Sequence, residues 1–235
     1  MMRTKANNAK KFMGTRAKIS IHKPRVQNNQ WSSGRMKLTN GGDSIEAGWM
    51  VNPEVFKDNE PHLYAKYAVG GKGCINTECP GYVEVIKESP LGNILHHSII
   101  GRTRWLLDLT IEKHQDDGNW WLSFVDGNGT IIPIGYWPKT LFSTMVEAAS
   151  QIEWGGEINN PGASKHQPEM GSGKKATYNT EISAYISRVK VVNENFQVVE
   201  PHDIEKEADC KHYYTTFDRG YPGHGLGRLF YYGGT

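Results

Sequence analysis

The chain has 235 residues, of which 37% are hydrophobic and 11% aromatic, and it carries 27 Lys and Arg against 25 Asp and Glu. This composition excludes an intrinsically disordered chain, and the length provides enough apolar surface for one folded domain. The near balance of charge excludes the broad basic surface of a nucleic-acid-binding or membrane-surface protein, so neither partner is expected.

The N-terminus is the exception to this balance. Seven Lys and Arg and no acidic residue occur in the first 23 residues. We interpret residues 1–14 as a solvated basic tail and residues 15–235 as the folded domain, with a targeting arm as the alternative for the basic stretch. No segment approaches the roughly 18 apolar residues that a membrane span needs, and no apolar stretch follows the basic residues as in a signal peptide.

Short segments rich in Val, Ile, Tyr, Trp and Thr recur between Gly, Asn, Asp and Pro clusters, a pattern typical of β-strands. Their close spacing favours antiparallel connections. We therefore predict an all-β, antiparallel two-sheet β-sandwich. The candidate strands, in chain order, are Ala17–His22, Arg35–Thr39, Ser44–Val51, His62–Val69, Tyr82–Lys87, Ile94–Ile99, Trp105–Lys113, Trp120–Val125, Ile131–Tyr136, Gln151–Ile158, Thr177–Val192, Phe196–Val199, Tyr213–Phe217 and Leu229–Tyr232.

One helix is predicted, over Lys139–Ser150. It follows Pro138, and its apolar residues fall at helical spacing. We expect it to cover one end of the sheets.

Two of the predicted strands place glutamates opposite a tryptophan. In Ser44–Val51, alternation puts Glu46 and Gly48 on one face and Trp49 on the other. The glycine leaves space beside the carboxylate for a substrate backbone. A half-exposed strand with no function shows the same alternation, so the arrangement is a hypothesis for a site.

The second strand, Gln151–Ile158, repeats the pattern. Glu153, Gly155 and Glu157 share one face, and Trp154 lies on the other, where we expect it to join the core. The two glutamates of this strand are roughly 13 Å apart by strand rise, so only one of them can be the close partner of Glu46.

Paired carboxylates are the candidate catalytic groups that remain when other motifs are excluded. The segment Gly171–Lys174 lacks the spacing of a phosphate-binding loop, and no His-Glu-x-x-His or Gly-x-Ser-x-Gly motif occurs. Two carboxyl groups within about 3 to 5 Å share one proton, which gives one acid and one base for activating water. A separation of about 5 to 9 Å is typical of glycoside cleavage instead.

The chain has three cysteines. Cys74 and Cys79 are close enough in sequence to form a disulfide, with Cys210 left over, and a zinc site is the competing interpretation.

Seven short motifs, occurring in order between about Thr15 and Gly234, resemble those of the plant neprosin family. They are Glu46–Pro53, Gly73-Cys74 with Cys79–Val83, Gly118–Leu122, Ile134–Pro138, Glu153–Glu157, Gln167–Gly173 and Phe230–Gly234. The resemblance implies a secreted glutamic peptidase, a two-sheet β-sandwich that is active in acid and cleaves on the carboxyl side of proline in peptides or proteins. It implies no cofactor and no metal.

The resemblance also assigns roles to residues. Glu46 matches the first catalytic glutamate, and we place the second at Glu157, with Glu153 as the alternative. For substrate binding we expect Gly48 and Gly155, with Tyr64 and Tyr178 as weaker candidates. Family precursors carry a signal peptide and an inhibitory propeptide; this chain opens with neither, so such a propeptide is an expected partner outside the chain. A fourth cysteine usually follows the last motif, where it would pair with Cys210.

Two other functions are compatible with the same sequence. A non-catalytic cell-wall protein would use Trp105, Trp120 and Trp121 to stack on polysaccharide. A glycosidase would use the same carboxylates on a sugar.

Overall fold

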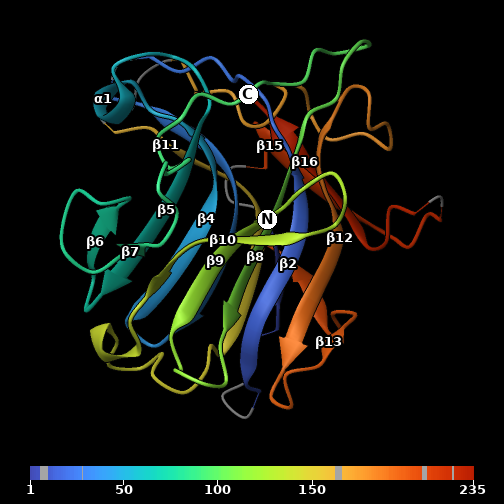
Figure 1. Cartoon of the computed structure of the whole chain (residues 1–235). Coiled ribbons are helices and arrows are strands. Elements are labelled where there is room, and N and C mark those ends of the chain that lie inside the picture. The colour runs from blue at the N-terminus through green and yellow to red at the C-terminus, as the bar shows by residue number, and fades with distance from the viewer. Residues whose placement is uncertain (6–9, 28, 162–165, 208–210, 224) are drawn as a thin grey trace.

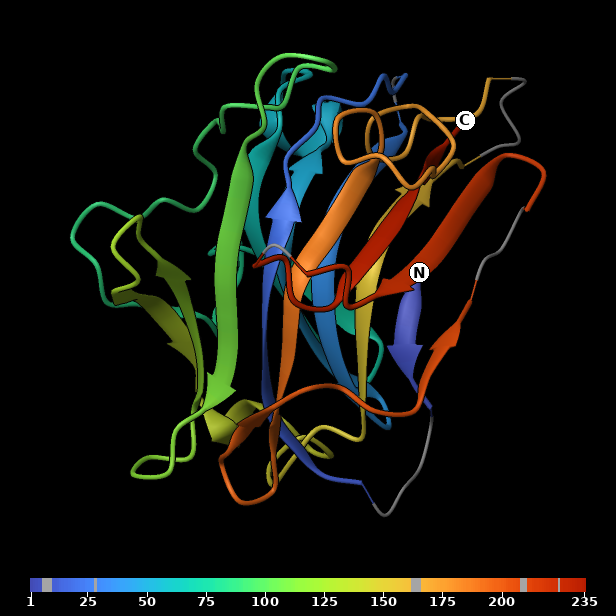
Figure 2. The same ribbon diagram turned by 90° about the vertical axis from the view of Figure 1, so that its right-hand side faces the viewer.

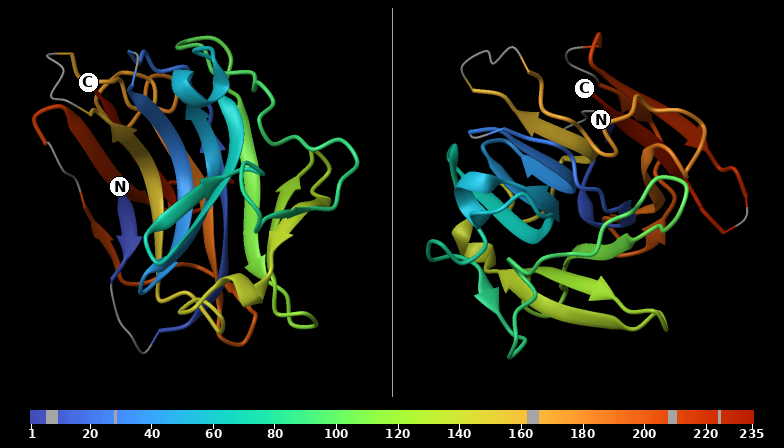
Figure 3. Two further views of the ribbon diagram at one scale, coloured as in Figure 1. Left: turned by 90° about the vertical axis from the view of Figure 1, so that its left-hand side faces the viewer. Right: turned by 90° about the horizontal axis from the view of Figure 1, so that it is seen from above.

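The computed structural model describes residues 1–5, 10–27, 29–161, 166–207, 211–223 and 225–235. These residues form two antiparallel sheets packed face to face (Figure 1; Figure 3, right). The predicted all-β, two-sheet fold is therefore confirmed.

The first sheet has seven strands in the order β14-β1-β11-β3-β4-β5-β6. Its centre is built by β11, β3 and β4, which pair over nearly their whole lengths. The strands are β14 (Ile204–Lys206), β1 (Met2–Thr4), β11 (Gln151–Asn159), β3 (Trp31–Asn40), β4 (Asp43–Val51), β5 (His62–Val69) and β6 (Lys72–Ile75).

The second sheet runs in the order β15-β16-β12-β2-β8-β9-β10-β7, with β13 paired to β12. Its strands are β15 (Tyr214–Gly220), β16 (Leu229–Gly234), β12 (Ala184–Asn193), β13 (Val198–Val199), β2 (Phe12–Ser20), β8 (Leu106–Lys113), β9 (Trp120–Val125), β10 (Ile131–Trp137) and β7 (Val83–Glu84). The expected strand Ile94–Ile99 is wrong: the segment contributes only an isolated bridge between Ile94 and His62.

The core lies between the two sheets and includes both tryptophans of the glutamate-bearing strands. Trp49 and Trp154 are fully buried. Each indole N–H reaches across to the second sheet: Trp49 Nε1 donates to the Ser20 carbonyl at 2.8 Å, and Trp154 Nε1 donates to Thr15 Oγ1 at 3.0 Å. Their expected place in the core is confirmed, so the glutamates of these strands lie on the outer face of the first sheet.

The predicted helix Lys139–Ser150 is wrong. Only a 3-10 turn, η1 (Lys139–Leu141), forms there, and the one α-helix of the described residues is the single turn α1 (Pro53–Phe56). The reason lies in Asp43, whose carboxylate accepts hydrogen bonds from the backbone N–H groups of Ser143 and Thr144 at 2.7 and 2.5 Å. These amide protons are therefore satisfied by a side chain from β4 and not by a helical ladder.

The N-terminal segment also differs from the expected solvated tail. Met2–Thr4 forms strand β1, inserted between β11 and β14, and both Met2 and Thr4 are buried (Figure 2). Apolar and hydroxyl side chains alternate here with Arg3, which outweighs the basic composition of the stretch as a whole.

Cys74 and Cys79 form a disulfide, with 6.1 Å between their Cα atoms, so they are not a zinc pair. Cys210 lies outside the described residues. Within the described part of the chain, no helix is long and apolar enough to cross a membrane.

Candidate active site

The pairing of β11, β3 and β4 brings the predicted glutamates together on the outer face of the first sheet. In register, Glu46 of β4 lies beside Lys37 of β3, and Lys37 lies beside Glu153 of β11. Two residues further along, Gly48 and Gly155 flank Arg35. Because side chains two residues apart share a face, Arg35 stands among the carboxylates.

Arg35 contacts three carboxylates. Its Nε donates to Glu157 Oε2 at 2.7 Å, and its second terminal nitrogen donates to Glu153 Oε2 at 3.1 Å. Nε also lies 3.7 Å from Glu46 Oε2. Burial acts to lower the pKa of Arg35, but the charges of the surrounding glutamates raise it above its ordinary value, so the guanidinium is a permanent cation.

Glu46 is the buried member of the group, with a side chain only 3% exposed. The Tyr64 hydroxyl donates to its Oε1 at 3.2 Å, and the Nζ atoms of Lys37 and Lys66 each lie 3.7 Å from the carboxylate. Burial, and then the charge of Glu46, raise the pKa of Tyr64 well above its ordinary value, so this hydroxyl stays protonated and remains a donor.

Glu157 is more open, with 31% of its side chain exposed against 14% for Glu153. Burial acts to raise the pKa of Glu157, but the charge and the hydrogen bond of Arg35 lower it below its ordinary value. Glu157 is therefore an accessible carboxylate that stays ionised in mild acid.

The contacts of Arg35 distinguish the two candidates for the partner of Glu46. Oε2 of Glu46 and Oε2 of Glu157 lie 3.7 and 2.7 Å from the same nitrogen, Nε, whereas Glu153 contacts a different nitrogen. The Glu46 and Glu157 oxygens are therefore separated by no more than those two contacts combined. That range is compatible with one water molecule between the two carboxyl groups.

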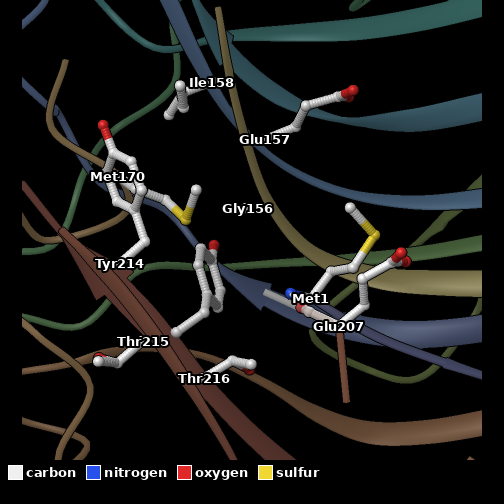
Figure 4. A pocket seen from close by; sticks show the side chains of 10 residues that line it. Met1, Gly156, Glu157, Ile158, Met170, Glu207, Tyr214, Thr215 and Thr216 are labelled. Atoms are coloured by element: carbon white, nitrogen blue, oxygen red, sulfur yellow. Dashed lines mark hydrogen bonds between the residues drawn. The ribbon is translucent and has the colours of Figure 1, made fainter. Parts of the chain in front are cut away.

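A cavity of about 200 Å³ adjoins Glu157, between β11 and the strands β15 and β16 (Figure 4). In Figure 4 the Glu157 carboxylate points away from Ile158 and Met170, so it stands at the rim and the apolar side chains form the interior. The lining residues are Met1, Gly156, Glu157, Ile158, Met170, Glu207, Tyr214, Thr215, Thr216 and Tyr232.

Gly156 provides part of the space for this arrangement. A Cβ at this position would lie 2.5 Å from Met170 and 2.7 Å from Tyr232, so a larger residue would push the lining apart. The sequence analysis named its neighbour, Gly155, whose φ of 146° favours glycine and whose Cβ would meet Met1 at 3.0 Å.

The other expected substrate-binding residues are placed differently from one another. Tyr64 touches Glu46, as described above. Gly48 allows β4 to approach β3, because a Cβ there would lie 2.0 Å from the Gly34 carbonyl oxygen. Tyr178 stacks on Phe217 with ring centroids 5.5 Å apart, on the second sheet, so its ring contacts lie outside the glutamate cluster.

The tryptophans proposed for polysaccharide stacking differ in exposure, since Trp105 is 44% exposed and Trp120 is buried. Trp120 is fully buried and donates to the Met145 carbonyl at 3.0 Å, so its assignment to a binding surface is wrong. Trp121 stacks on His114 with centroids 4.7 Å apart and packs against Tyr136, and Trp105 stacks on His96.

The cations of this site, Arg35, Lys37 and Lys66, were not among the site residues expected from the sequence. Arg35 and Lys37 alternate with the buried Met36 and Leu38 along β3, which is the signal that would have placed both on the glutamate face. No cluster of three or more His, Cys, Asp or Glu side chains suited to a metal ion occurs among the described residues.

The family model described as Neprosin matches residues 28–235, which covers most of the chain and all the strands that carry the glutamates. Membership of this family indicates a peptidase-like function.

Proposed function

The chain belongs to the neprosin family, and from this premise we propose that it is a glutamic endopeptidase, active in acid, that cleaves on the carboxyl side of proline. The catalytic pair in this proposal is Glu46 and Glu157. We further propose that it acts outside the cell on proline-containing proteins, and that an inhibitory propeptide outside this chain regulates it.

One observation carries the proposal. Two carboxylates from different strands lie within 3.7 Å of a single buried nitrogen, Nε of Arg35, and one of them borders a cavity. A buried carboxylate such as Glu46 is costly to desolvate, and ionisable groups in such surroundings are concentrated at catalytic sites.

The two glutamates take different roles. Glu157, exposed and held ionised by Arg35, accepts a proton from a water molecule that attacks the scissile carbonyl. Glu46, in its protonated form, donates a hydrogen bond to the developing oxyanion and then transfers its proton to the leaving nitrogen. Transfer of a proton from Glu157 to Glu46, through the solvent at the site, then returns both carboxyl groups to their starting states.

The charge of the site accounts for the need for acid. Three cations, Arg35, Lys37 and Lys66, face three carboxylates on this surface. With all three carboxylates ionised the charges balance, but the pair then lacks the proton that the leaving nitrogen requires. Lowering the pH supplies that proton while Glu157 remains ionised.

Access to Glu46 requires the lysines to move. Lys37 and Lys66 are 24% and 34% exposed, respectively, and both are long, flexible side chains, so a substrate backbone can displace them without moving the strands.

The cavity beside Glu157 supports the proposed preference for proline. Its lining includes Met170, Ile158 and the rings of Tyr214 and Tyr232, which suit a compact apolar ring.

The test is mass spectrometry of an unstructured, proline-containing protein digested at pH about 3 and about 7. We expect cuts after proline in acid. Both Glu46→Gln and Glu157→Gln should lose roughly 100- to 10,000-fold in rate, because each removes one of the two proton-transfer groups. Circular dichroism establishes that the variants are folded.

Glu153→Gln is the matched control, since it removes a carboxylate from the same face that the mechanism does not use. If Glu153→Gln abolishes cleavage and Glu157→Gln does not, the assignment of the pair is wrong. Release of reducing sugar from a polysaccharide, with peptides left intact, would replace the proposal with a glycosidase.

A further inference from the structure

Arg35 is the centre of the glutamate cluster and is itself almost completely buried, with a side chain 3% exposed. A buried guanidinium is costly unless its N–H groups are paired, and here they are paired to Glu157 and Glu153. The sheet therefore holds a fixed cation at the point where the proposed reaction needs one glutamate ionised and the other protonated.

The contacts of Arg35 with the two proposed catalytic residues are unequal. Glu157 receives a direct, charge-assisted hydrogen bond of 2.7 Å, whereas Glu46 lies 3.7 Å from the same nitrogen. The hydrogen bond to Glu46 comes from the neutral Tyr64 hydroxyl, at 3.2 Å. Because a hydrogen bond from a cation favours the charged form of a carboxyl group, Arg35 discriminates in favour of ionised Glu157.

Two lysines add positive charge on the Glu46 side of the site. Lys37 and Lys66 contact Glu46 at 3.7 Å and lower the pKa of Glu157 less than Arg35 does. Beyond β11, Glu207 lines the cavity with the hydroxyl-bearing Tyr214 and Tyr232, and the Met1 amino group donates to the Glu207 carbonyl.

Arg3 of β1 completes the set of neighbours. It forms ion pairs with Glu205 and Glu207 and lies close enough to Glu153 for their charges to interact. The carboxylates that Arg3 pairs with are thus on β14 and directly after it. The direct hydrogen bond from a cation to Glu157 comes from Arg35.

We propose that Arg35 is the positioning residue of the pair: it orients Glu157 and holds it ionised, so that Glu157 acts as the base and Glu46 as the acid. This inference rests on the proposed function, and it assigns the two roles to a structural cause. The aromatic and apolar lining of the cavity has no part in it.

The test is the pH dependence of kcat/KM for a proline-containing peptide. The acid limb of the profile reports the ionisation of the base in the free enzyme. In Arg35→Gln, which keeps hydrogen-bonding capacity but removes the charge, we expect this limb to move upward by about 1 to 3 pH units. A purely structural role for Arg35 would lower the whole profile without moving the limb.

Arg35→Lys sharpens the test. Lysine keeps the charge but not the planar fork, so we expect a smaller displacement of the acid limb with a loss of about 100-fold in kcat from misplacement of Glu157. Arg16→Gln is the matched control, because Arg16 pairs with Glu112 on the second sheet, whereas the glutamate cluster is on the first sheet. An acid limb that coincides in Arg35→Gln and wild type would overturn the inference while leaving the peptidase intact.

Carboxyl ¹³C NMR titration of the wild-type protein separates the inference from the proposed function. We expect Glu157 to ionise below the ordinary pH range of a glutamate, with its signal assigned from Glu157→Gln, and this readout does not require Arg35 variants to fold. Ionisation of Glu157 at or above the ordinary range would overturn the inference. Absence of peptide cleavage would overturn the proposed function and the catalytic part of the inference, and the titration would still decide whether Glu157 is held ionised in the folded protein.

Discussion

Both faces of β11, β3 and β4 carry buried side chains, but different forces hold these side chains in place. On the core face, Trp49 and Trp154 are fully buried among apolar side chains, and each indole has one hydrogen bond to the second sheet. On the outer face, Arg35 and Glu46 are nearly as buried but are held by ion pairs. Burial of apolar area stabilises a fold directly, whereas buried ion pairs roughly offset their own desolvation. We infer that the core face maintains the sheet and the outer face serves chemistry.

The largest expected effect is a loss of stability from a substitution on the core face. Trp154→Ala should lower the free energy of unfolding by about 3 to 5 kcal/mol, because it leaves a cavity between the sheets. Urea denaturation at pH 7 measures it. Trp154→Phe is the matched variant: it keeps most of the packing and loses the bond to Thr15, which costs about 1 kcal/mol. A loss below about 1 kcal/mol in Trp154→Ala would contradict the role given to this face.

Acid should destabilise the protein through His22, because burial opposes protonation of this side chain in the folded state. His22 is buried after the end of β2, and burial, with a smaller contribution from His97, lowers its pKa to about 4. The unfolded chain takes up this proton near pH 6.5 and the folded chain only near pH 4, so stability should fall as the pH drops through this window. The loss attributable to His22 is about 3 kcal/mol.

The measurement is urea denaturation of wild type and His22→Gln at pH 7, 5 and 4. Stability should depend less on pH in the variant, and the exposed His202→Gln should behave as wild type. Glu157 acts in the same direction but in stronger acid: because its pKa is lowered, the stability that it contributes is present above the ordinary glutamate pKa and is lost as the pH falls through its lowered pKa. Equal slopes for wild type and His22→Gln would contradict the prediction for His22.

A smaller effect is expected where β4 approaches β3. Gly48→Ala places a Cβ 2.0 Å from the Gly34 carbonyl oxygen, so the strands must shift, at a cost of about 1 to 3 kcal/mol. Thermal denaturation of this variant beside Gly42→Ala, whose Cβ would meet nothing closer than 3.8 Å, isolates the effect of the contact. Equal melting temperatures would show that the outer face tolerates movement of β4.

The smallest effect tests the outer face itself. Glu153→Gln should lower the free energy of unfolding by about 0.5 to 1.5 kcal/mol, since Arg35 keeps Glu157 and Glu46 as partners. Denaturant titration at pH 7 measures it. A loss as large as that of Trp154→Ala would mean that the ion pairs carry much of the stability.

Strand alternation was sufficient to predict which side chains of these strands lie in the core and which lie on the outer face. The pattern around Glu46 placed Trp49 in the core, and the same argument placed Trp154 there, because in both strands the period of two coincides with a buried side. It could not identify Arg35 as a partner, since strand order and register are set by contacts between residues about 120 positions apart, as between Arg35 and Glu157.

The wrong helix has the same origin. The residues after Pro138 have helical spacing, but the carboxylate of Asp43, about 100 residues earlier, binds their amide groups. The stacking of Tyr178, a weaker substrate-binding candidate, on Phe217 was equally invisible in the sequence. Local patterns do not report such tertiary partners.

Strand β1 has a practical consequence for anyone preparing this protein. Met1 lies on the wall of the cavity beside Glu157, so whatever residues are joined to it in a recombinant chain emerge at the place where substrates are expected to bind (Figure 4). An affinity tag or cleavage scar at this end would act as a tethered competitor. Assays of activity and inhibition should therefore compare samples tagged at Met1 with samples tagged at the exposed Thr235.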